Sequence, residues 1–414
     1  MVNTLAYLYG EDAVQVQKFR INKNIEAFRR LYGDRGEIRI FSAPGRTEIG
    51  GNHTDHNKGR VLAAAVDLDI AAVVRPESGN VIRIKSAGFD EDVVDISDLS
   101  VKQEEKNTSA ALIRGVAAGF VKNGHKVCGF TAYTTSNVLK GSGLSSSAAF
   151  EVLVGTILSA LANDDSVSPV EIAKIAQYAE NEYFGKPSGL MDQMASSVGG
   201  SVTIDFADTD KPVIESIPFD LKGIDLCIVD TKADHADLTP EYAAIPAEMK
   251  SVAAYFGQEV LRGITKKQIF ENIQALRESC GDRAVSRALH FIDENERVTG
   301  EADALKNGDN QRFLDLVNES GESSYKYLQN IFALSDPRSQ AMVIALYSAK
   351  DILGDKGAVR VHGGGFAGTI QAFVPCSETD DFVDRMESIF GDKTCYRLRI
   401  RPVGGSEIDV KEII

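Results

Sequence analysis

The chain has 414 residues, and 45 Lys and Arg against 60 Asp and Glu give a formal net charge of −15. Hydrophobic residues make up 43% and charged residues 25%, which is typical of a folded globular protein and excludes a disordered or coiled-coil chain. Nucleic acids and acidic lipids are bound by neutralising phosphates, so we expect neither a nucleic-acid partner nor a membrane partner. At about 150 residues per domain, the length predicts two or three domains.

The cysteines and the hydropathy pattern predict a cytoplasmic location. An odd number of cysteines cannot all pair within one chain, and no C-x-x-C motif occurs among Cys128, Cys227, Cys280, Cys376 and Cys395. We expect reduced thiols, as in cytoplasmic proteins. The first ten residues lack the features of a signal peptide, and no run of about 18 apolar residues predicts a membrane span.

In chain order, the first half predicts a mixed α/β domain. Short β-type runs occupy residues 37–42, 61–74, 80–86 and 127–135. An apolar helix is expected over residues 143–162. A second helix is expected over 169–184, since Ser168 is a good N-cap, Glu171 fits a capping box and Gly185 fits a C-terminal cap.

The second half predicts strands at 201–206, 212–217 and 225–229, and then mainly helices as far as residue 354, among them 265–280 and 337–352. Residues 358–362, 369–374 and 394–401 again favour strands. The change in composition near residue 230 indicates a domain boundary, which we place between residues 225 and 226.

Residues 42–59 crowd polar side chains between two strand-like runs, which is typical of a functional loop on a rigid sheet. Arg46, His53, Asp55 and His56 are the chemically active members. A solvated hairpin is the alternative interpretation. His53 and His56 are also spaced as a metal pair, but two ligands do not make a zinc site.

Residues 139–149 form a Gly- and Ser-rich loop that runs into the apolar helix. Glycine lets the backbone close round a ligand, and free N–H groups at a helix start attract phosphate. The loop is neither a Walker A motif nor a dinucleotide-binding G-x-G-x-x-G motif. A serine-rich helix cap without a ligand is the alternative.

Two further segments give weaker signals. Residues 361–369 hold four glycines within six positions, which suggests close approach to a ligand or to the first loop. Residues 186–193 place Asp192 near the start of a short helix. A carboxylate there can also have no role beyond a favourable interaction with the helix dipole.

Together the four segments resemble the galactokinase branch of the GHMP kinase superfamily over essentially the whole chain. The resemblance implies a two-domain α/β (α+β) fold. Residues 1–225 would form an N-terminal domain like that of a ribosomal protein, and residues 226–414 a C-terminal GHMP domain, with the active site in the cleft between them. It also implies an ATP-dependent sugar 1-kinase that uses Mg²⁺ and makes galactose 1-phosphate.

By this resemblance, Asp192 would orient or deprotonate the sugar's 1-hydroxyl group, and Arg46 would keep that carboxylate ionised. The sugar contacts would be Asn52, His53, Asp55, Gly189 and Tyr242. The phosphates would lie against Gly141, Ser142, Gly143, Leu144, Ser145, Ser146, Ser147 and Ala148. Ser146, Ser147 and Glu180 would lie near Mg²⁺.

The sequence also departs from the family. Galactokinases carry glutamate where Asn52 stands and asparagine where Glu48 stands. Because a neutral amide at position 52 would not repel an acidic sugar, galacturonate is an alternative substrate to galactose. A sensor that binds sugar and ATP without catalysis, and a mevalonate- or homoserine-type kinase, are further alternatives.

Overall fold

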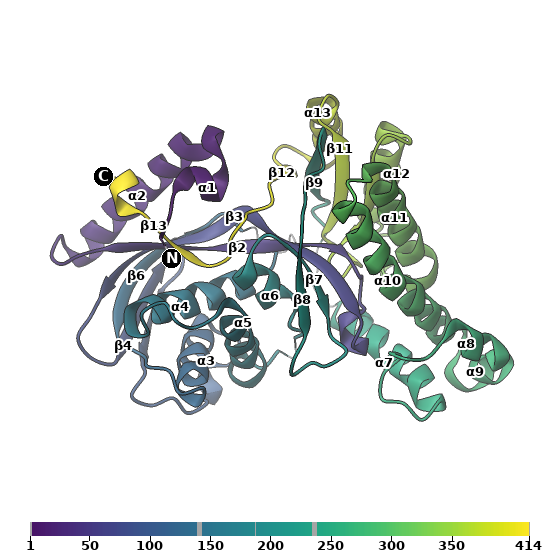
Figure 1. The fold of residues 1–414 in the computed structure, drawn as a ribbon, viewed down its shortest axis with the longest axis horizontal. Coiled ribbons are helices and arrows are strands. Elements are labelled where there is room, and N and C mark those ends of the chain that lie inside the picture. Colours follow the sequence, from purple (N-terminus) through teal and green to yellow (C-terminus); the bar gives the residue numbers. More distant parts are fainter. Residues whose placement is uncertain (1, 139–142, 187, 234–237, 414) are drawn as a thin grey trace.

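Two β-sheets, each covered by helices, organise the computed structural model of the protein (Figure 1). The structure describes residues 2–138, 143–186, 188–233 and 238–413. None of the helices within these ranges combines the length and apolar character that a membrane crossing requires.

The larger sheet has the strand order β1-β13-β2-β3-β6-β4-β5, with β7 paired to β3 and β8 to β7. The long strand β3 is central because its first residues pair with β7 and its last with β6. The strands are β1 (Val2–Asn3), β2 (Arg39–Gly50), β3 (Arg60–Pro76), β4 (Val81–Ser86), β5 (Glu91–Asp95), β6 (Phe130–Ser136), β7 (Ser201–Asp205), β8 (Val213–Ile217) and β13 (Ser406–Ile408).

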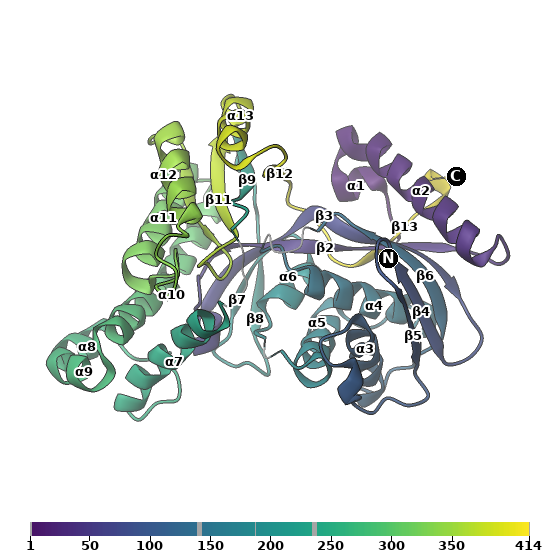
Figure 2. The same cartoon turned by 180° about the vertical axis from the view of Figure 1, so that it is seen from behind.

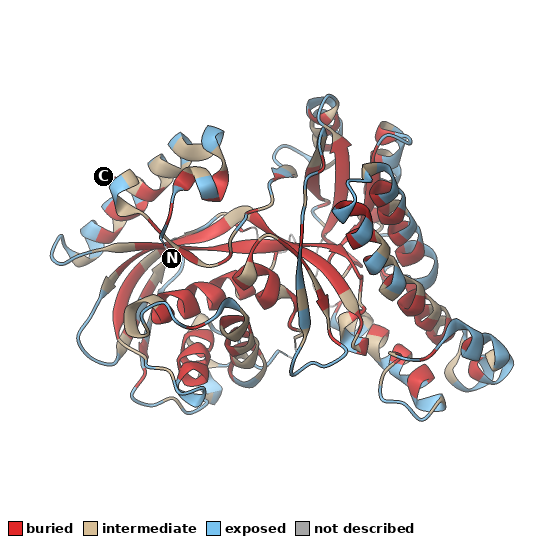
Figure 3. Cartoon of the chain, in the orientation of Figure 1, coloured by how far each residue is buried: buried red, intermediate tan, exposed pale blue. Residues whose placement is uncertain are grey.

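Helices α3 to α6 lie on one face of this sheet, and α1 and α2 lie on the other (Figures 1 and 2). Their inner surfaces and the sheet between them are buried (Figure 3). The helical elements of this half are α1 (Leu5–Tyr9), η1 (Glu11–Ala13), α2 (Val14–Tyr32), η2 (Asp55–Asn57), η3 (Gln103–Glu105), α3 (Ser109–Lys122), α4 (Ser146–Ala162), α5 (Pro169–Tyr178), the π-helix η4 (Ala179–Phe184) and α6 (Met191–Val198).

The smaller sheet is antiparallel, in the order β10-β11-β9-β12. Its strands are β9 (Ile224–Asp230), β10 (Ala358–His362), β11 (Thr369–Pro375) and β12 (Cys395–Leu398). The accompanying helical elements are α7 (Thr239–Tyr255), α8 (Lys266–Glu271), α9 (Ile273–Cys280), α10 (Asp282–Lys306), α11 (Asn310–Ser323), the π-helix η5 (Ser324–Leu328), α12 (Ala341–Leu353) and α13 (Thr379–Phe390). The short η6 (Val410–Glu412) lies beside α1 and α2 at the larger sheet.

The structure differs from the sequence-based expectations in several places. Strand β2 continues to Gly50 across two register shifts, one between Pro44 and Arg46 and one between Glu48 and Gly50. The helix expected over 265–280 is interrupted at Asn272. The Ser168 and Gly185 caps are confirmed, but the capping role of Glu171 is wrong, because its carboxylate contacts His125 Nε2 at 2.8 Å instead.

The end of the chain returns to the larger sheet. Strand β13 pairs antiparallel with β2 and parallel with β1, so the two termini lie side by side (Figure 1). A domain division near residue 225 remains our proposal, since β9 begins the smaller sheet there. Strand β13 would then belong to the N-terminal domain, because it pairs with β2.

A buried ion cluster ties this tail to the N-terminal half. The carboxylate of Asp69 on β3 accepts hydrogen bonds from Arg20 (2.6 Å), Tyr9 (2.5 Å) and Ser42. Arg401 NH1, from the tail, lies 3.3 Å from the same carboxylate. Burial opposes ionisation of Asp69, but the two guanidinium groups outweigh it and hold its pKa below the usual value.

We expect Asp69→Asn to lower the free energy of unfolding by roughly 3 to 5 kcal/mol, because it leaves the buried Arg401 and the half-buried Arg20 without their counter-charge. Urea unfolding measures this loss. Asp282→Asn, which removes an ion pair on the protein surface, is the control and should leave the midpoint nearly unchanged. Equal effects of the two substitutions would contradict the role of Asp69 as the counter-charge of Arg20 and Arg401.

Candidate active site

Strand β2 carries two charged side chains into the interior. Arg46 and Glu48 lie two residues apart and pair regularly with β3, so their side chains point to the same face of the sheet. The Arg46 side chain is 7% exposed and that of Glu48 is 6% exposed. Buried charges need partners, and the surroundings of both residues supply them.

Asp192, in the first turn of α6, is the partner of Arg46. Arg46 Nε donates to Asp192 Oδ1 at 2.6 Å, and Ser145 Oγ donates to Asp192 Oδ2 at 2.7 Å. Burial would raise the pKa of Asp192, but the charge of Arg46 and the two hydrogen bonds prevail and lower it. The carboxylate is therefore ionised at neutral pH. Its side chain is 29% exposed and accessible to a ligand.

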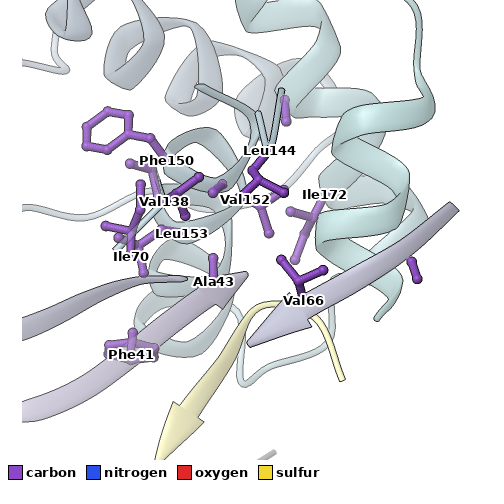
Figure 4. Packing of buried hydrophobic residues seen from close by; sticks show 14 of the residues in the cluster. Phe41, Ala43, Val66, Ile70, Val138, Leu144, Phe150, Val152, Leu153 and Ile172 are labelled. Carbon is purple, nitrogen blue, oxygen red and sulfur yellow. The ribbon is translucent and has the colours of Figure 1, made fainter. Parts of the chain in front are cut away.

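The loop before α4 is held against this pair. Arg46 N donates to Leu144 O at 3.0 Å, and Arg46 NH1 donates to Gly143 O. The Leu144 side chain points into the core beside Val138 and Val152 (Figure 4). Because the loop is anchored on both sides, the first turn of α4 faces the site.

This first turn provides the expected anion-binding groups. The first intrahelical bond runs from Ala149 N to Ser145 O, so the N–H groups of residues 146–148 precede the hydrogen-bond ladder of the helix. These groups and the positive end of the helix dipole suit phosphate. Gly141 and Ser142, also expected at the phosphates, lie outside the described residues.

Glu180 and Ser147 lie together beside this turn. Ser147 Oγ donates to Glu180 Oε1 at 3.1 Å, Lys186 Nζ lies 3.1 Å from the same oxygen, and Gln193 Nε2 donates to Oε2 at 2.7 Å. Two oxygens about 3 Å apart fit neighbouring corners of the small Mg²⁺ octahedron. No cluster of three or more His, Cys, Asp or Glu residues that could hold a metal occurs in the described part of the chain.

A pocket of about 260 Å³ opens next to the Arg46–Asp192 pair. Its walls come from four regions of the chain: β2 with its following loop, the segment before α6, α6 itself, and the glycine loop after β10. The lining residues are Arg46, Glu48, His53, Asp55, His56, Lys186, Ser188, Gly189, Met191, Asp192, Gly363 and Gly364.

Asp55 and Gly189 meet in this pocket. A Cβ atom at Gly189 would lie 2.2 Å from Asp55 Oδ2, so only glycine leaves the carboxylate in place. His53 Nε2 lies 2.9 Å from Gly364 O and donates to it. Burial and the neighbouring His56 lower the pKa of His53 to about 4. The ring is neutral at pH 7, so its Nδ1 atom can accept a hydrogen bond.

Two expected sugar contacts, Asn52 and Tyr242, are not among the lining residues of this pocket. Asn52 is fully buried. Its Nδ2 atom donates to Glu48 Oε1 (3.0 Å) and Gly363 O (2.8 Å), and its Oδ1 atom accepts from Asn330 (2.8 Å). Tyr242 OH donates to Gly365 O at 2.8 Å. This geometry favours supporting roles for Asn52 and Tyr242 rather than direct contact with a ligand.

Several lining residues are not among those expected from the sequence, including Glu48, Lys186 and Ser188. Glu48 was noted only as a departure from the family pattern, and nothing in its spacing distinguished a pocket carboxylate from a buried structural one. The expectation that the glycine loop after β10 approaches the first loop is confirmed, since Gly363 O and Gly364 O accept from Asn52 and His53.

Comparison with known proteins agrees with this arrangement. Residues 26–76 match the galactokinase galactose-binding signature, and residues 111–200 match the GHMP kinase N-terminal domain. The chain is 32% identical to the galactokinase of Streptomyces coelicolor, over 88% of this chain and 92% of that protein. The chain belongs to the galactokinase family. Identity to the Lactobacillus helveticus galactokinase is 31%, over 86% and 91% of the two chains.

Solved structures agree with the two-sheet GHMP kinase fold. The crystal structure of Lactococcus lactis galactokinase complexed with galactose has a TM-score of 0.81 at 22% identity, and the likeness covers 94% of this chain and 99% of that one. A mevalonate kinase has a TM-score of 0.61 at 16% identity, with 87% and 99% covered. This member of the galactokinase family is therefore an ATP-dependent sugar kinase.

We expect Gly189→Ala to raise the KM for the sugar about tenfold or more, because the new methyl group displaces Asp55 and small misplacements are costly in active sites. The KM for ATP should stay unchanged. Steady-state kinetics with each substrate varied in turn tests this. Gly300→Ala, in α10, where the added atom would meet only the Leu316 side chain, is the control.

Proposed function

We propose that this protein transfers the γ-phosphoryl group of ATP to the anomeric hydroxyl group of D-galactose. The observation that carries the proposal is the Arg46–Asp192 pair at 2.6 Å, which stands between an anion-binding helix start and a polar pocket. The galactokinase relatives and the galactose-bound neighbour support galactose as the sugar. Five free cysteines support a cytoplasmic location.

In the proposed reaction, Asp192 orients the sugar's 1-hydroxyl group. Each carboxylate oxygen accepts one hydrogen bond from the protein and keeps a lone-pair position for another. The hydroxyl oxygen attacks the γ-phosphorus atom, the bond to the β,γ-bridging oxygen breaks and ADP leaves. The proton passes to Asp192 and then to water. Because its pKa is low, Asp192 holds the proton only briefly and acts mainly by positioning.

Positioning and charge stabilisation dominate phosphoryl transfer. Arg46 contributes positive charge beside the reacting atoms, and the N–H groups of Ser146, Ser147 and Ala148 would hold phosphate oxygens. Ser147 and Glu180 would hold Mg²⁺, with Ser146 adjacent. The bound ion would neutralise phosphate charge during transfer.

The pocket favours a neutral sugar over galacturonate. The case for galacturonate rested on the neutral amide of Asn52, which is buried behind the wall. The pocket lining contains the carboxyl groups of Glu48, Asp55 and Asp192. Its two cations already have partners, since Arg46 pairs with Asp192 and Lys186 pairs with Glu180. A substrate carboxylate would add like charge to this partly desolvated space, and such repulsion disfavours binding.

An ADP-release assay with Mg·ATP tests the function directly. D-galactose and D-galacturonate are compared at equal concentrations, with buffer alone as the control. We expect sugar-dependent ADP release with a higher kcat/KM for galactose. A higher kcat/KM for galacturonate would contradict the proposed substrate. Sugar binding without ADP release from any sugar would instead identify a non-catalytic sensor.

We expect Asp192→Asn to lower kcat about a hundredfold or more, the scale of losing an acid–base group. Its affinity for ATP should be retained, because Asp192 lines the pocket proposed for the sugar, whereas the phosphates are expected at the N–H groups of residues 146–148. Turnover and equilibrium nucleotide binding are measured on the same preparation. Turnover close to that of the unmodified protein would remove Asp192 from the mechanism.

A further inference from the structure

Glu48 is a pocket carboxylate that phosphoryl transfer leaves without a role. Its Oε1 atom accepts from Asn52 Nδ2 at 3.0 Å and from Arg360 NH2 at 2.8 Å. Both donors are fully buried. Arg360 is held in turn by its NH1 donation to Ile49 O. Glu48 is therefore fixed from behind by two rigid groups.

The other oxygen of Glu48 has a different environment. Oε2 accepts no hydrogen bond from the described part of the chain. It is also absent from the set of fully buried, unpaired side-chain atoms, so it is accessible to solvent. Since Glu48 lines the pocket, this oxygen faces the space where the sugar would bind. A fixed carboxylate with one oxygen saturated and one open is well prepared to accept a hydrogen bond from a ligand.

The position of Glu48 on β2 indicates which part of a ligand it meets. Two residues along a strand span about 6.6 Å, so Glu48 lies approximately the length of a sugar ring beyond Arg46. Arg46 and Asp192 mark the reacting end of the pocket. Glu48 consequently lies toward the opposite end of a bound hexose.

We propose that Glu48 determines sugar specificity: its Oε2 atom accepts a hydrogen bond from a hydroxyl group on the half of the hexose remote from carbon 1, and this acceptor disfavours a sugar that places another carboxylate there. This inference rests on the proposed function, because it takes carbon 1 to be the phosphorylated position. Asn52 and Arg360 are positioning residues that hold Glu48.

A nearby carboxyl group provides a matched control. Glu301, in α10, is also fully buried, and its Oε2 atom would lie 1.8 Å from a Cβ atom at Gly50. It does not line the pocket. Burial raises the pKa of Glu301 well above its usual value. Glu301→Gln therefore makes the same substitution at a buried position outside the pocket.

The experiment compares the unmodified protein, Glu48→Gln and Glu301→Gln on D-galactose, its 4-deoxy and 6-deoxy analogues, and D-galacturonate. We expect the unmodified protein to prefer galactose over one deoxy analogue by at least about tenfold, the scale of a hydrogen bond to a charged group. In Glu48→Gln that preference should fall severalfold, and relative kcat/KM for galacturonate should rise about tenfold. Glu301→Gln should keep both ratios.

Unchanged ratios in a folded Glu48→Gln protein would overturn the inference while leaving the kinase function intact. No turnover of any sugar by the unmodified protein would instead overturn the proposed function. If Glu48→Gln does not fold, the unmodified protein still provides a test. A carboxylate at the remote end should favour 6-amino-6-deoxy-D-galactose over D-galacturonate, and the reverse order would overturn the inference.

Discussion

Strand β2 is buried along nearly its whole length, and this burial constrains the rest of the site. Every polar side chain on the strand must find its partner inside the protein, because water cannot supply one. Arg46 therefore fixes Asp192, Glu48 fixes Arg360, and Thr47 contacts His362 at 3.1 Å. Each contact joins β2 to a segment far away in the chain. The strand thus aligns the phosphate-binding loop, α6 and the glycine loop after β10 in a single site.

Close backbone approach is the second organising feature. A Cβ atom at Gly364 would lie 2.7 Å from the Tyr242 ring, and one at Gly365 would lie 2.1 Å from Asn330 O. The glycine loop therefore fits tightly between α7 and the segment after η5. Its carbonyl groups accept hydrogen bonds from Asn52 and His53, so backbone forms this side of the pocket.

The sequence predicted the α/β class and most strands, because alternating apolar residues and Gly-rich turns reflect local physics. The family resemblance also picked out several of the residues that the structure brings together at the pocket, namely Arg46, His53, Asp55, Gly189 and Asp192. The sequence could not predict that Glu48 lines the pocket while Asn52 is buried behind it. Both are polar residues on one short segment, and their exposure depends on Arg360 and Asn330, roughly 300 residues later. The π-helical end of the 169–184 helix was equally hidden, since it depends on tertiary packing.

The place of β13 between β1 and β2 has a consequence for synthesis of the chain. Strand β2 is made early, but its neighbour β13 emerges roughly 350 residues later, which is about 20 to 70 seconds at 5 to 20 residues per second. During that interval one edge of the larger sheet has unpaired N–H and C=O groups, which invite pairing with other chains. The ion pair between Asp69 and Arg401 also cannot form until the end of the chain has been made. The first sheet to be translated is thus the last to be completed, and the growing chain is more exposed to aggregation than the finished protein.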